Sequence, residues 1–315
     1  MADEQEITSD ENARAKRESV EVGCPITMGE GGKRCGRPLH DAPDGVDEKP
    51  VCLMHSKDSQ KQSGPFFDAF LREFERILKE AGEEEAHFEQ FVFPFLNLGG
   101  RTFHAICRFE SAVFAHGARF LIATFVQKAV FWRATFSKNT EFRGVTFKQN
   151  AYFNEATFTQ NADFGRVAFM QDGDFSEATF EQIADFKEAT FMHNADFGGV
   201  TFKQMLCFTG TTFNGTANWR RSRFLDQAEF RHTKFDPQVE GEPSAVFALA
   251  NFSKPGEVIF DDIDLSRALF HNCDVSQVWF TSSVSWARRK YNRGVAVFEE
   301  TISVNTPGRA GGLIV

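Results

Sequence analysis

Residues 131–158 read FWRATFSKNTEFRGVTFKQNAYFNEATF, and phenylalanine recurs in this stretch at alternating steps of five and six residues. The same alternation runs from Phe103 to Phe235, where every position of the series holds Phe except position 219, which holds Trp. We call these aromatic residues rungs. The residue two places before each rung is nearly always small: Ala, Gly, Ser, Thr, Val or Cys. An internal repeat this regular predicts a stack of similar units, in which every repeat makes the same turn.

The spacing of the rungs excludes a long α-helix and favours short β-strands. At about 100° per residue, a step of five rotates successive rungs by roughly 140°, so they share no helix face. Thr, Gly, Asn and Val, which are common between the rungs, are also mediocre helix formers. In an extended segment, the small residue and the rung two places later point to the same side. Coils stacked about 4.8 Å apart would bury a continuous aromatic ladder, which predicts a β-solenoid.

Units such as ADF at 162–164 and ATF at 178–180 resemble pentapeptide-repeat proteins. In that family a small residue and a polar residue precede an apolar rung, which is Leu or Phe. The resemblance covers roughly residues 93–280 and implies an all-β fold, a right-handed quadrilateral β-helix with four short sides per coil. Because every second step holds an extra residue, four sides take 22 residues here. The spacing returns to steps of five over 260–280, which predicts a final coil of twenty.

A short segment rich in Gly and Pro, residues 21–62, precedes the ladder and holds few apolar side chains. Its three thiols and the imidazole of His55, which closes the set in a Cys-x-x-His pair, form a donor set typical of structural zinc. A segment with so few apolar side chains cannot form a hydrophobic core, so it needs a bound metal of this kind to become ordered. The sequence therefore predicts a zinc module, with His40 as a rival ligand and unligated thiols in a loop as the alternative. The predicted ligands are Cys24, Cys35, Cys52 and His55.

Residues 63–90 are predicted to form an amphipathic helix and a cap for the solenoid. The helix opens at Gly64-Pro65 and ends at Gly82, since proline suits the first turn and glycine the C-terminus. This helix can dock on the solenoid or cover its first coil, shielding an open sheet edge. A partner-binding helix is the alternative. The apolar face contains Phe67, Phe70, Leu71, Phe74, Ile77, Leu78 and Ala81.

The remaining organisation follows from composition. Residues 1–20 are expected to form a disordered acidic tail, residues 91–286 the β-helix, and residues 287–315 a flexible tail that begins with a small basic cluster. The six cysteines are scattered and do not suggest a disulfide framework. No stretch approaches the about 18 uncharged apolar residues of a membrane span, and no signal-peptide pattern opens the chain. Cytoplasmic location is the expectation.

A coil of 22 residues sorts the outward side chains into columns. Thr135, Thr157 and Thr179 fall in one column, and a second Thr column is expected on the opposite face. A third column is acidic. It is either a solvated face or a strip that recognises a basic surface on a protein partner or weakly collects cations. The candidate partner-binding residues in this column are Glu141, Asp163, Asp185 and Glu229.

The motifs of common enzymes are not found: there is no nucleophile elbow, phosphate-cradling glycine loop or His–carboxylate–nucleophile set. We therefore expect neither catalysis nor a small-molecule substrate. Some proteins of the resembling family protect DNA gyrase by imitating DNA with an acidic surface. The ladder here carries fifteen basic and thirteen acidic residues, a poor imitation, and direct nucleic-acid binding is not expected either. The leading hypothesis is a non-enzymatic scaffold or protein–protein interaction module; the alternative is a DNA-mimicking modulator or protector of gyrase.

Overall fold

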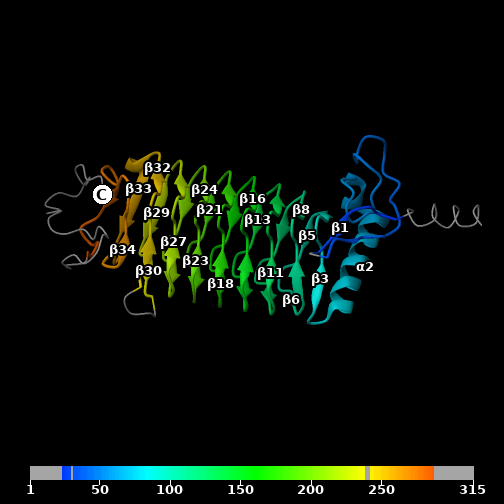
Figure 1. The fold of residues 1–315 in the computed structure, drawn as a ribbon, viewed down its shortest axis with the longest axis horizontal. Helices are drawn as coiled ribbons and strands as arrows, with labels where there is room; N and C mark the ends of the chain where they lie inside the picture. Colours follow the sequence, from blue (N-terminus) through cyan, green and yellow to red (C-terminus); the bar gives the residue numbers. More distant parts are fainter. Residues whose placement is uncertain (1–22, 30, 238–241, 287–315) are drawn as a thin grey trace, which may run out of the picture.

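The computed structural model describes residues 23–29, 31–237 and 242–286. In Figure 1 these residues form a straight rod of stacked coils, with one α-helix and a small looped module at the N-terminal end. The acidic tail predicted for residues 1–20, the tail predicted for 287–315 and its basic cluster lie outside the described residues. No helix in the described part of the chain is both long enough and apolar enough to cross a membrane.

Four parallel sheets form the four sides of the rod, and each strand pairs with strands one coil before and after it. The first sheet contains β6 (Thr102–Phe103), β10 (Thr124–Phe125), β14 (Thr146–Phe147), β18 (Ala168–Phe169), β22 (Thr190–Phe191), β26 (Thr212–Phe213) and β30 (Lys234–Phe235). The second contains β3 (Glu85–His87), β7 (Ile106–Arg108), β11 (Ala129–Val130), β15 (Ala151–Tyr152), β19 (Gly173–Asp174), β23 (Ala195–Asp196), β27 (Ala217–Asn218), β31 (Ala245–Val246) and β34 (Ala268–Leu269).

The other two sheets alternate with these around the rod. The third contains β4 (Val92–Phe93), β8 (Val113–Phe114), β12 (Thr135–Phe136), β16 (Thr157–Phe158), β20 (Thr179–Phe180), β24 (Thr201–Phe202), β28 (Arg223–Phe224) and β32 (Asn251–Phe252). The fourth contains β5 (Leu96–Asn97), β9 (Ala118–Arg119), β13 (Thr140–Glu141), β17 (Ala162–Asp163), β21 (Ala184–Asp185), β25 (Leu206–Cys207), β29 (Ala228–Arg231), β33 (Val258–Asp261) and β35 (Trp279–Phe280). Strand β3 pairs with β7, so the first strand of these four sheets begins at Glu85, before residue 91, where the sequence predicts the β-helix to start.

The register confirms the coil of 22 residues. Thr124 pairs with Thr146, and the two Thr columns lie on the first and third sheets, which face away from each other. After Phe235 the coil first widens, so that Ala217 pairs with Ala245, because the chain makes an excursion there. It then narrows to the predicted twenty residues between Phe260 and Phe280. A 3-10 helix, η3 (Pro255–Glu257), precedes β33.

Aromatic rings fill the rod from end to end. Phe175 stacks on Phe153 at 4.9 Å and on Phe197 at 5.1 Å between ring centroids, one coil away on each side. The same ring meets Phe186, from the opposite side of the coil, edge to face at 5.4 Å. Both geometries are the ones aromatic pairs prefer, and each pair adds about 0.5–1.5 kcal/mol beyond its burial. Trp219 continues the ladder, stacked 4.8 Å from Phe247.

The alternation of five and six arises at the corners. In a five-residue step the chain makes a tight turn: Ala112 donates its backbone N–H to the carbonyl oxygen of Phe109 at 3.0 Å, and Ser111 has a φ of 55°. A left-handed residue at this place is the requirement of a type II turn. The same corner recurs in successive coils at Arg133, Glu155, Glu177 and Gly199, and on the opposite edge at Ile122, Gly144, Arg166, Glu188 and Gly210.

The N-terminal end of the rod is covered by α2 (Gly64–Ala81). Phe74 packs against Phe88 at 4.9 Å, and Phe70 packs against Phe93 at 5.5 Å between ring centroids. The helix ends where Gly82 donates its N–H to the Leu78 carbonyl oxygen. A 3-10 helix, η2 (Ser59–Gln62), leads into it. At the other end, the Trp286 ring lies 5.0 Å from that of Phe280, so a large side chain covers the last coil there too.

Candidate metal centre

A β-hairpin brings Cys24 and Cys35 together although eleven positions separate them. Its strands, β1 (Thr27–Met28) and β2 (Lys33–Arg34), pair in antiparallel register. The backbone N–H of Cys24 donates to the carbonyl oxygen of Arg37 at 2.8 Å, and that of Cys35 donates to Ile26 at 2.7 Å. The hairpin explains how Cys24 and Cys35, which are farther apart in sequence than the cysteine pair of a usual zinc knuckle, still form one side of the candidate metal site.

The other two candidate ligands come from one tight turn. The backbone N–H groups of His55 and Ser56 both donate to the carbonyl oxygen of Cys52 at 3.0 Å. Lys61 stabilises this turn, because its ammonium donates hydrogen bonds to the carbonyl oxygens of Leu53, at 3.2 Å, and of Ser56. That lysine is 1% exposed, and nothing in the sequence marks it as buried. Packing of η2 and α2 against the turn encloses it.

The four side chains converge with the spacing of a tetrahedral site. All four donor atoms lie within 4.8 Å of one another. The sulfurs of Cys35 and Cys52 are 3.7 Å apart, and Nδ1 of His55 lies 3.4 Å from the sulfur of Cys24 and 3.2 Å from that of Cys52. Zinc bonds of about 2.3 Å to sulfur and 2.0–2.1 Å to nitrogen, arranged tetrahedrally, require about 3.8 Å between sulfurs and about 3.5 Å from sulfur to nitrogen. These three distances are close to the tetrahedral values, and the cluster can hold a metal ion.

Contacts around the cluster fix its orientation. Nε2 of His55 donates to the carbonyl oxygen of Glu89 at 3.2 Å, which leaves Nδ1 as the metal-binding nitrogen. The His55 ring also meets Phe91 edge to face, with centroids 5.1 Å apart. Nη1 of Arg37 donates to the Cys35 sulfur at 3.2 Å, while Nε of the same guanidinium binds Glu73 of α2 at 2.6 Å. The cluster is therefore joined to both the helix and the first coil.

The electrostatics of the cluster favour a bound cation. The hydrogen bond from Cys52, with others from His55 and Arg37, lowers the pKa of Cys35 to about 3 against the effect of burial. The pKa of Cys52 is raised, because it donates that hydrogen bond and is buried beside a thiolate. A divalent cation bound by these sulfurs would accept them as thiolates, so binding should release protons.

His40, the rival ligand, lies outside the cluster. Its Nε2 is 2.8 Å from Oδ2 of Asp58, with both side chains nearly buried, and its ring meets Phe66 edge to face. This pair braces the loop between the hairpin and η2. The Cys-x-x-His spacing had favoured His55, and His40 stayed a rival because its position depends on how the loop folds back.

The acidic column predicted for the solenoid is present on the fourth sheet, where the register places Glu141, Asp163, Asp185, Cys207 and Glu229 in line. The carboxylates already have local partners. Glu141 accepts two hydrogen bonds from Arg119, at 2.8 and 3.0 Å. Oδ1 of Asp163 accepts the backbone N–H of Gly165 at 2.8 Å, and Oδ1 of Asp185 does the same for Lys187. The two aspartates therefore also shape the corners.

A second acidic column lies on the opposite, second sheet and was not singled out from the sequence. Asp174 and Asp196 pair in register there, followed by Asn218. Their Oδ1 atoms likewise accept the backbone N–H two residues later, at 2.8 Å for both aspartates and 3.0 Å for Asn218. The signal that could have revealed this role is the recurrence of Asp or Asn immediately before a rung. Burial, together with a neighbouring aspartate, raises the pKa of Asp163 and of Asp196.

Comparison with protein families matches residues 131–179 and 170–206 to pentapeptide repeats (9 copies). Both matches lie inside the solenoid, so together with the four-sided coil they show that this part of the chain is a pentapeptide-repeat solenoid. No curated protein and no solved structure matches the chain.

Proposed function

We propose that this protein is a non-enzymatic scaffold, a rigid pentapeptide-repeat rod that presents flat faces to a protein partner. The observation that carries this proposal is the unbroken aromatic ladder inside four hydrogen-bonded sheets, which makes the rod stiff and its surface periodic. A rod of this kind offers an extended docking surface instead of a single reactive centre.

We further propose that the metal is zinc, bound by Cys24, Cys35, Cys52 and His55 as a structural staple. Support comes from the donor set, its tetrahedral spacing and the four protein ligands, which leave no open coordination position. Metal analysis of the purified chain should find about one zinc per chain. A Cys24→Ser variant should lose it, while Cys207→Ser, which removes a thiol outside the cluster, should keep it.

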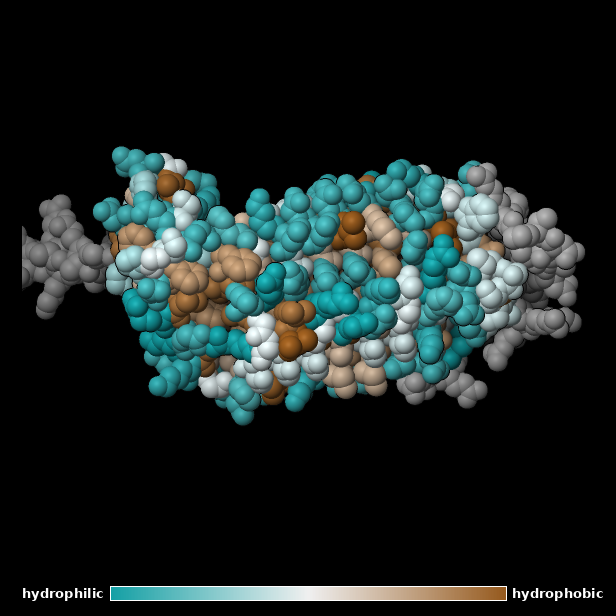
Figure 2. All heavy atoms as spheres, turned by 180° about the vertical axis from the view of Figure 1, so that it is seen from behind, coloured by the Kyte–Doolittle hydropathy of each residue, from teal (hydrophilic) through white to brown (hydrophobic). Residues whose placement is uncertain are grey.

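The partner-binding face we favour is the fourth-sheet column, with Glu141, Asp163, Asp185 and Glu229. Carboxylates repeat there at the strand spacing, so a basic surface of matching period would meet them in register. Figure 2, seen from the opposite side to Figure 1, shows that apolar atoms also gather at the end of the rod that carries the module. Large exposed apolar side chains of the module and first coils are Leu39, Phe66, Phe95 and Ile122.

Imitation of DNA is less well supported by the surface. Arginine or lysine bridges to glutamate in the adjacent coil at several corners: Arg133 with Glu155 at 2.6 Å, Arg166 with Glu188 at 2.7 Å and Lys203 with Glu181 at 2.8 Å. Such pairs cancel charge along the axis, whereas a DNA mimic needs unbroken negative potential. A supercoiling assay in which gyrase is inhibited, or is protected from a drug, by this chain would reverse that preference.

The scaffold proposal is tested by crosslinking with mass spectrometry in the native cell, using variants that change charge alone. Asp163→Asn and Asp185→Asn keep the Oδ1 acceptor that closes each corner, as Asn218 does naturally. The double variant should lose crosslinks between the fourth-sheet column and its partner. The matched control, Asp174→Asn with Asp196→Asn on the opposite face, should retain them. If the wild-type chain yields no reproducible partner, or both pairs behave alike, the proposed face is wrong.

A further inference from the structure

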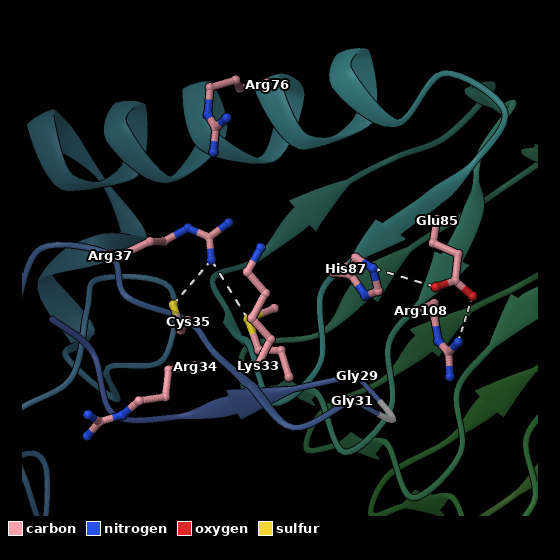
Figure 3. A pocket seen from close by; sticks show the side chains of 11 residues that line it. Gly29, Gly31, Lys33, Arg34, Cys35, Arg37, Arg76, Glu85, His87 and Arg108 are labelled. Atoms are coloured by element: carbon pink, nitrogen blue, oxygen red, sulfur yellow. Dashed lines mark hydrogen bonds and ion pairs between the residues drawn. The ribbon is translucent and has the colours of Figure 1, made fainter.

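Arginine side chains at the N-terminal end of the rod are paired with carboxylates. A cavity of about 570 Å³ between the metal-binding hairpin, α2 and the first coil is lined by several basic side chains, and we call it the basic cavity. Figure 3 shows Arg108 on its wall bound to Glu85. Glu73 of α2 binds both Arg37 and Arg76, at 2.6 and 2.8 Å. Guanidinium groups paired in this way offer little free charge to a ligand.

One corner of the solenoid differs, because its arginines have no such partners. The corner lies between β27 and β28, toward the C-terminal end of the rod (Figure 1). Its three arginines, Arg220, Arg221 and Arg223, are exposed, and we call them the arginine corner. Within the described ranges, no carboxylate oxygen lies within 4.0 Å of their side chains, whereas Arg231 on β29 contacts Asp261 at 3.3 Å.

The register explains why these charges are unpaired. Elsewhere a basic corner residue meets glutamate one coil away, as Arg133 meets Glu155 at 2.6 Å. At the arginine corner the register neighbours are uncharged. They are Gly198, Gly199 and Thr201 one coil earlier, and Ala248, Leu249 and Asn251 one coil later. Asp196 lies one coil before Asn218, but its Oδ1 accepts hydrogen bonds from Asn218 and from the backbone of Gly198.

The backbone of the arginine corner is fixed by hydrogen bonds. The N–H of Arg221 donates to the carbonyl oxygen of Ala248 at 2.9 Å, one coil later. That of Arg223 donates to the carbonyl oxygen of Val200 at 2.8 Å, one coil earlier. Ser222 between them is buried, and its hydroxyl is hydrogen-bonded inside the rod. Three like charges are thus anchored close together, where they repel one another until an anion neutralises them.

The surroundings limit what such an anion can be. The second sheet, next to the corner, carries Asp174 and Asp196 in register, and the whole chain has a net charge of −9. A long polyanion such as a nucleic-acid strand would lie over these carboxylates and be repelled. Leu249 is 39% exposed, lies one coil after Arg221 and offers an apolar contact. A short segment that carries both carboxylates and an apolar side chain therefore matches the corner best.

We propose that the arginine corner, with Leu249, is a docking surface for a short acidic peptide segment of a protein partner. Guanidinium groups bind carboxylates in a bidentate manner, which an ammonium group does not, so three arginines suit carboxylate recognition. The corner lies between the second and third sheets, away from the fourth-sheet column, and takes a ligand of the opposite charge. The rod can therefore hold an acidic segment here independently of any basic partner at that column.

The test is fluorescence anisotropy of labelled probes titrated with the full chain at low ionic strength. The probes are a short peptide of glutamate and leucine, a version with alanine in place of leucine, a version with glutamine in place of glutamate, and a single-stranded oligonucleotide of similar charge. We expect saturable, salt-sensitive binding of both glutamate peptides, tighter with leucine, and no binding of the glutamine peptide. The oligonucleotide should bind less tightly than the glutamate–leucine peptide.

Arg221→Gln with Arg223→Gln should weaken binding of the glutamate–leucine peptide by about fivefold or more. Arg133→Gln with Arg166→Gln is the matched control, because it removes the same charge from two corners whose arginines are already paired with glutamate. Its affinity should stay within about twofold of wild type. Leu249→Asn should weaken binding of the leucine-containing peptide and spare that of the alanine version, since asparagine suits the positive φ of this corner.

The proposal is overturned if neither glutamate peptide saturates, if the glutamine peptide or the oligonucleotide binds as tightly, or if the control pair loses as much affinity as the Arg221→Gln and Arg223→Gln pair. It is also overturned if the arginines bind a second copy of this chain. Sedimentation would then show self-association of the wild-type chain that the Arg221→Gln and Arg223→Gln pair abolishes. Unchanged affinity in Leu249→Asn would refute the apolar contact.

Discussion

The Nε2 atom of His55 donates to the carbonyl oxygen of Glu89 at 3.2 Å, and this contact joins the metal cluster to the first coil of the solenoid. Nδ1 of the same ring faces the sulfurs of Cys24 and Cys52. One imidazole therefore connects the candidate metal cluster to the polypeptide that enters β4. The module is consequently a structural part of the solenoid cap, and ordering of one should support the other.

Removing the metal should loosen the cap and spare the middle of the rod. Structural zinc contributes directly to folding, so a chelator should speed amide exchange in the hairpin, in the Cys52–His55 turn and in α2 by about tenfold or more. Hydrogen exchange with mass spectrometry measures this. Residues 131–206, which lie coils away and are held by their own ladder, should exchange as before. Unchanged exchange in the cap after verified metal loss would contradict the structural role.

The aromatic rungs should differ in how much they stabilise the fold. Phe175→Ala should cost about 3–5 kcal/mol of unfolding free energy, because it leaves a cavity between Phe153 and Phe197. Trp219→Phe should cost at most about 1 kcal/mol. Its buried indole Nε1 has no hydrogen-bond partner among the described residues, and removing that donor recovers about 1–3 kcal/mol against the lost packing. Urea unfolding of both variants decides this, and equal losses would show that the indole is satisfied.

A new carboxylate at position 218 should make stability depend on pH. Burial first, and Asp174 second, raise the pKa of Asp196, while the amide of Asn218 donates to Asp196 at 2.9 Å and lowers it. Asn218→Asp replaces that donor with a like charge and raises the pKa further. A carboxyl with a raised pKa in the folded state stabilises the fold below its unfolded pKa, and this contribution is lost as pH rises through the folded value.

The Asn218→Asp variant should therefore be less stable than wild type by about 1 kcal/mol at pH 7, and the difference should close as pH falls toward about 4. Thermal unfolding across that range measures it. Asn218→Ser, which removes the donor without adding charge, should show a loss that varies less with pH. A deficit of Asn218→Asp that stays constant with pH would mean that the two side chains do not interact as the structure shows.

At the left-handed corners, replacing glycine should destabilise the fold, whereas introducing glycine should change its stability little. Gly199 has a φ of 69°, and a Cβ there would lie 3.3 Å from Cγ of Glu177. Gly199→Ala should cost about 1 kcal/mol, the usual price of an L-residue in this conformation. Glu177 occupies the same corner one coil earlier, with a φ of 58°. Glu177→Gly relieves the backbone strain of this φ but raises the conformational entropy of the unfolded chain. Because these two effects oppose each other, the variant should change stability by at most about 0.5 kcal/mol. Thermal unfolding that finds Gly199→Ala more stable than wild type would refute the type II turn.

Much of the fold was predictable because one regular pattern carried it. The spacing of Phe from 103 to 235 determines which residues share a side, and hence the 22-residue register, the Thr columns and the acidic column. The helix limits followed from Gly64-Pro65 and Gly82, which act locally. The candidate metal cluster was predictable from residue type, since three cysteines and a closing histidine in a segment without a core have few other uses, and the structure brings these four side chains together.

The remaining features depend on packing that no local pattern encodes. The pairing of His40 with Asp58 results from the way the loop folds back, and the burial of Lys61 results from η2 lying against the Cys52–His55 turn. The left-handed corners are occupied by Arg, Glu and Ile as well as Gly, so residue type did not predict their positive φ angles. The basic cavity arises between three elements that are distant in sequence.

The central claim is that a metal with three sulfur ligands and one nitrogen ligand anchors the cap of the rod, and X-ray absorption at the zinc edge tests it most directly. The account predicts about one zinc per chain, with three sulfurs at about 2.3 Å and one nitrogen at about 2.0–2.1 Å. A zinc content far below one per chain, or a coordination shell made of oxygen and nitrogen without sulfur, would contradict it.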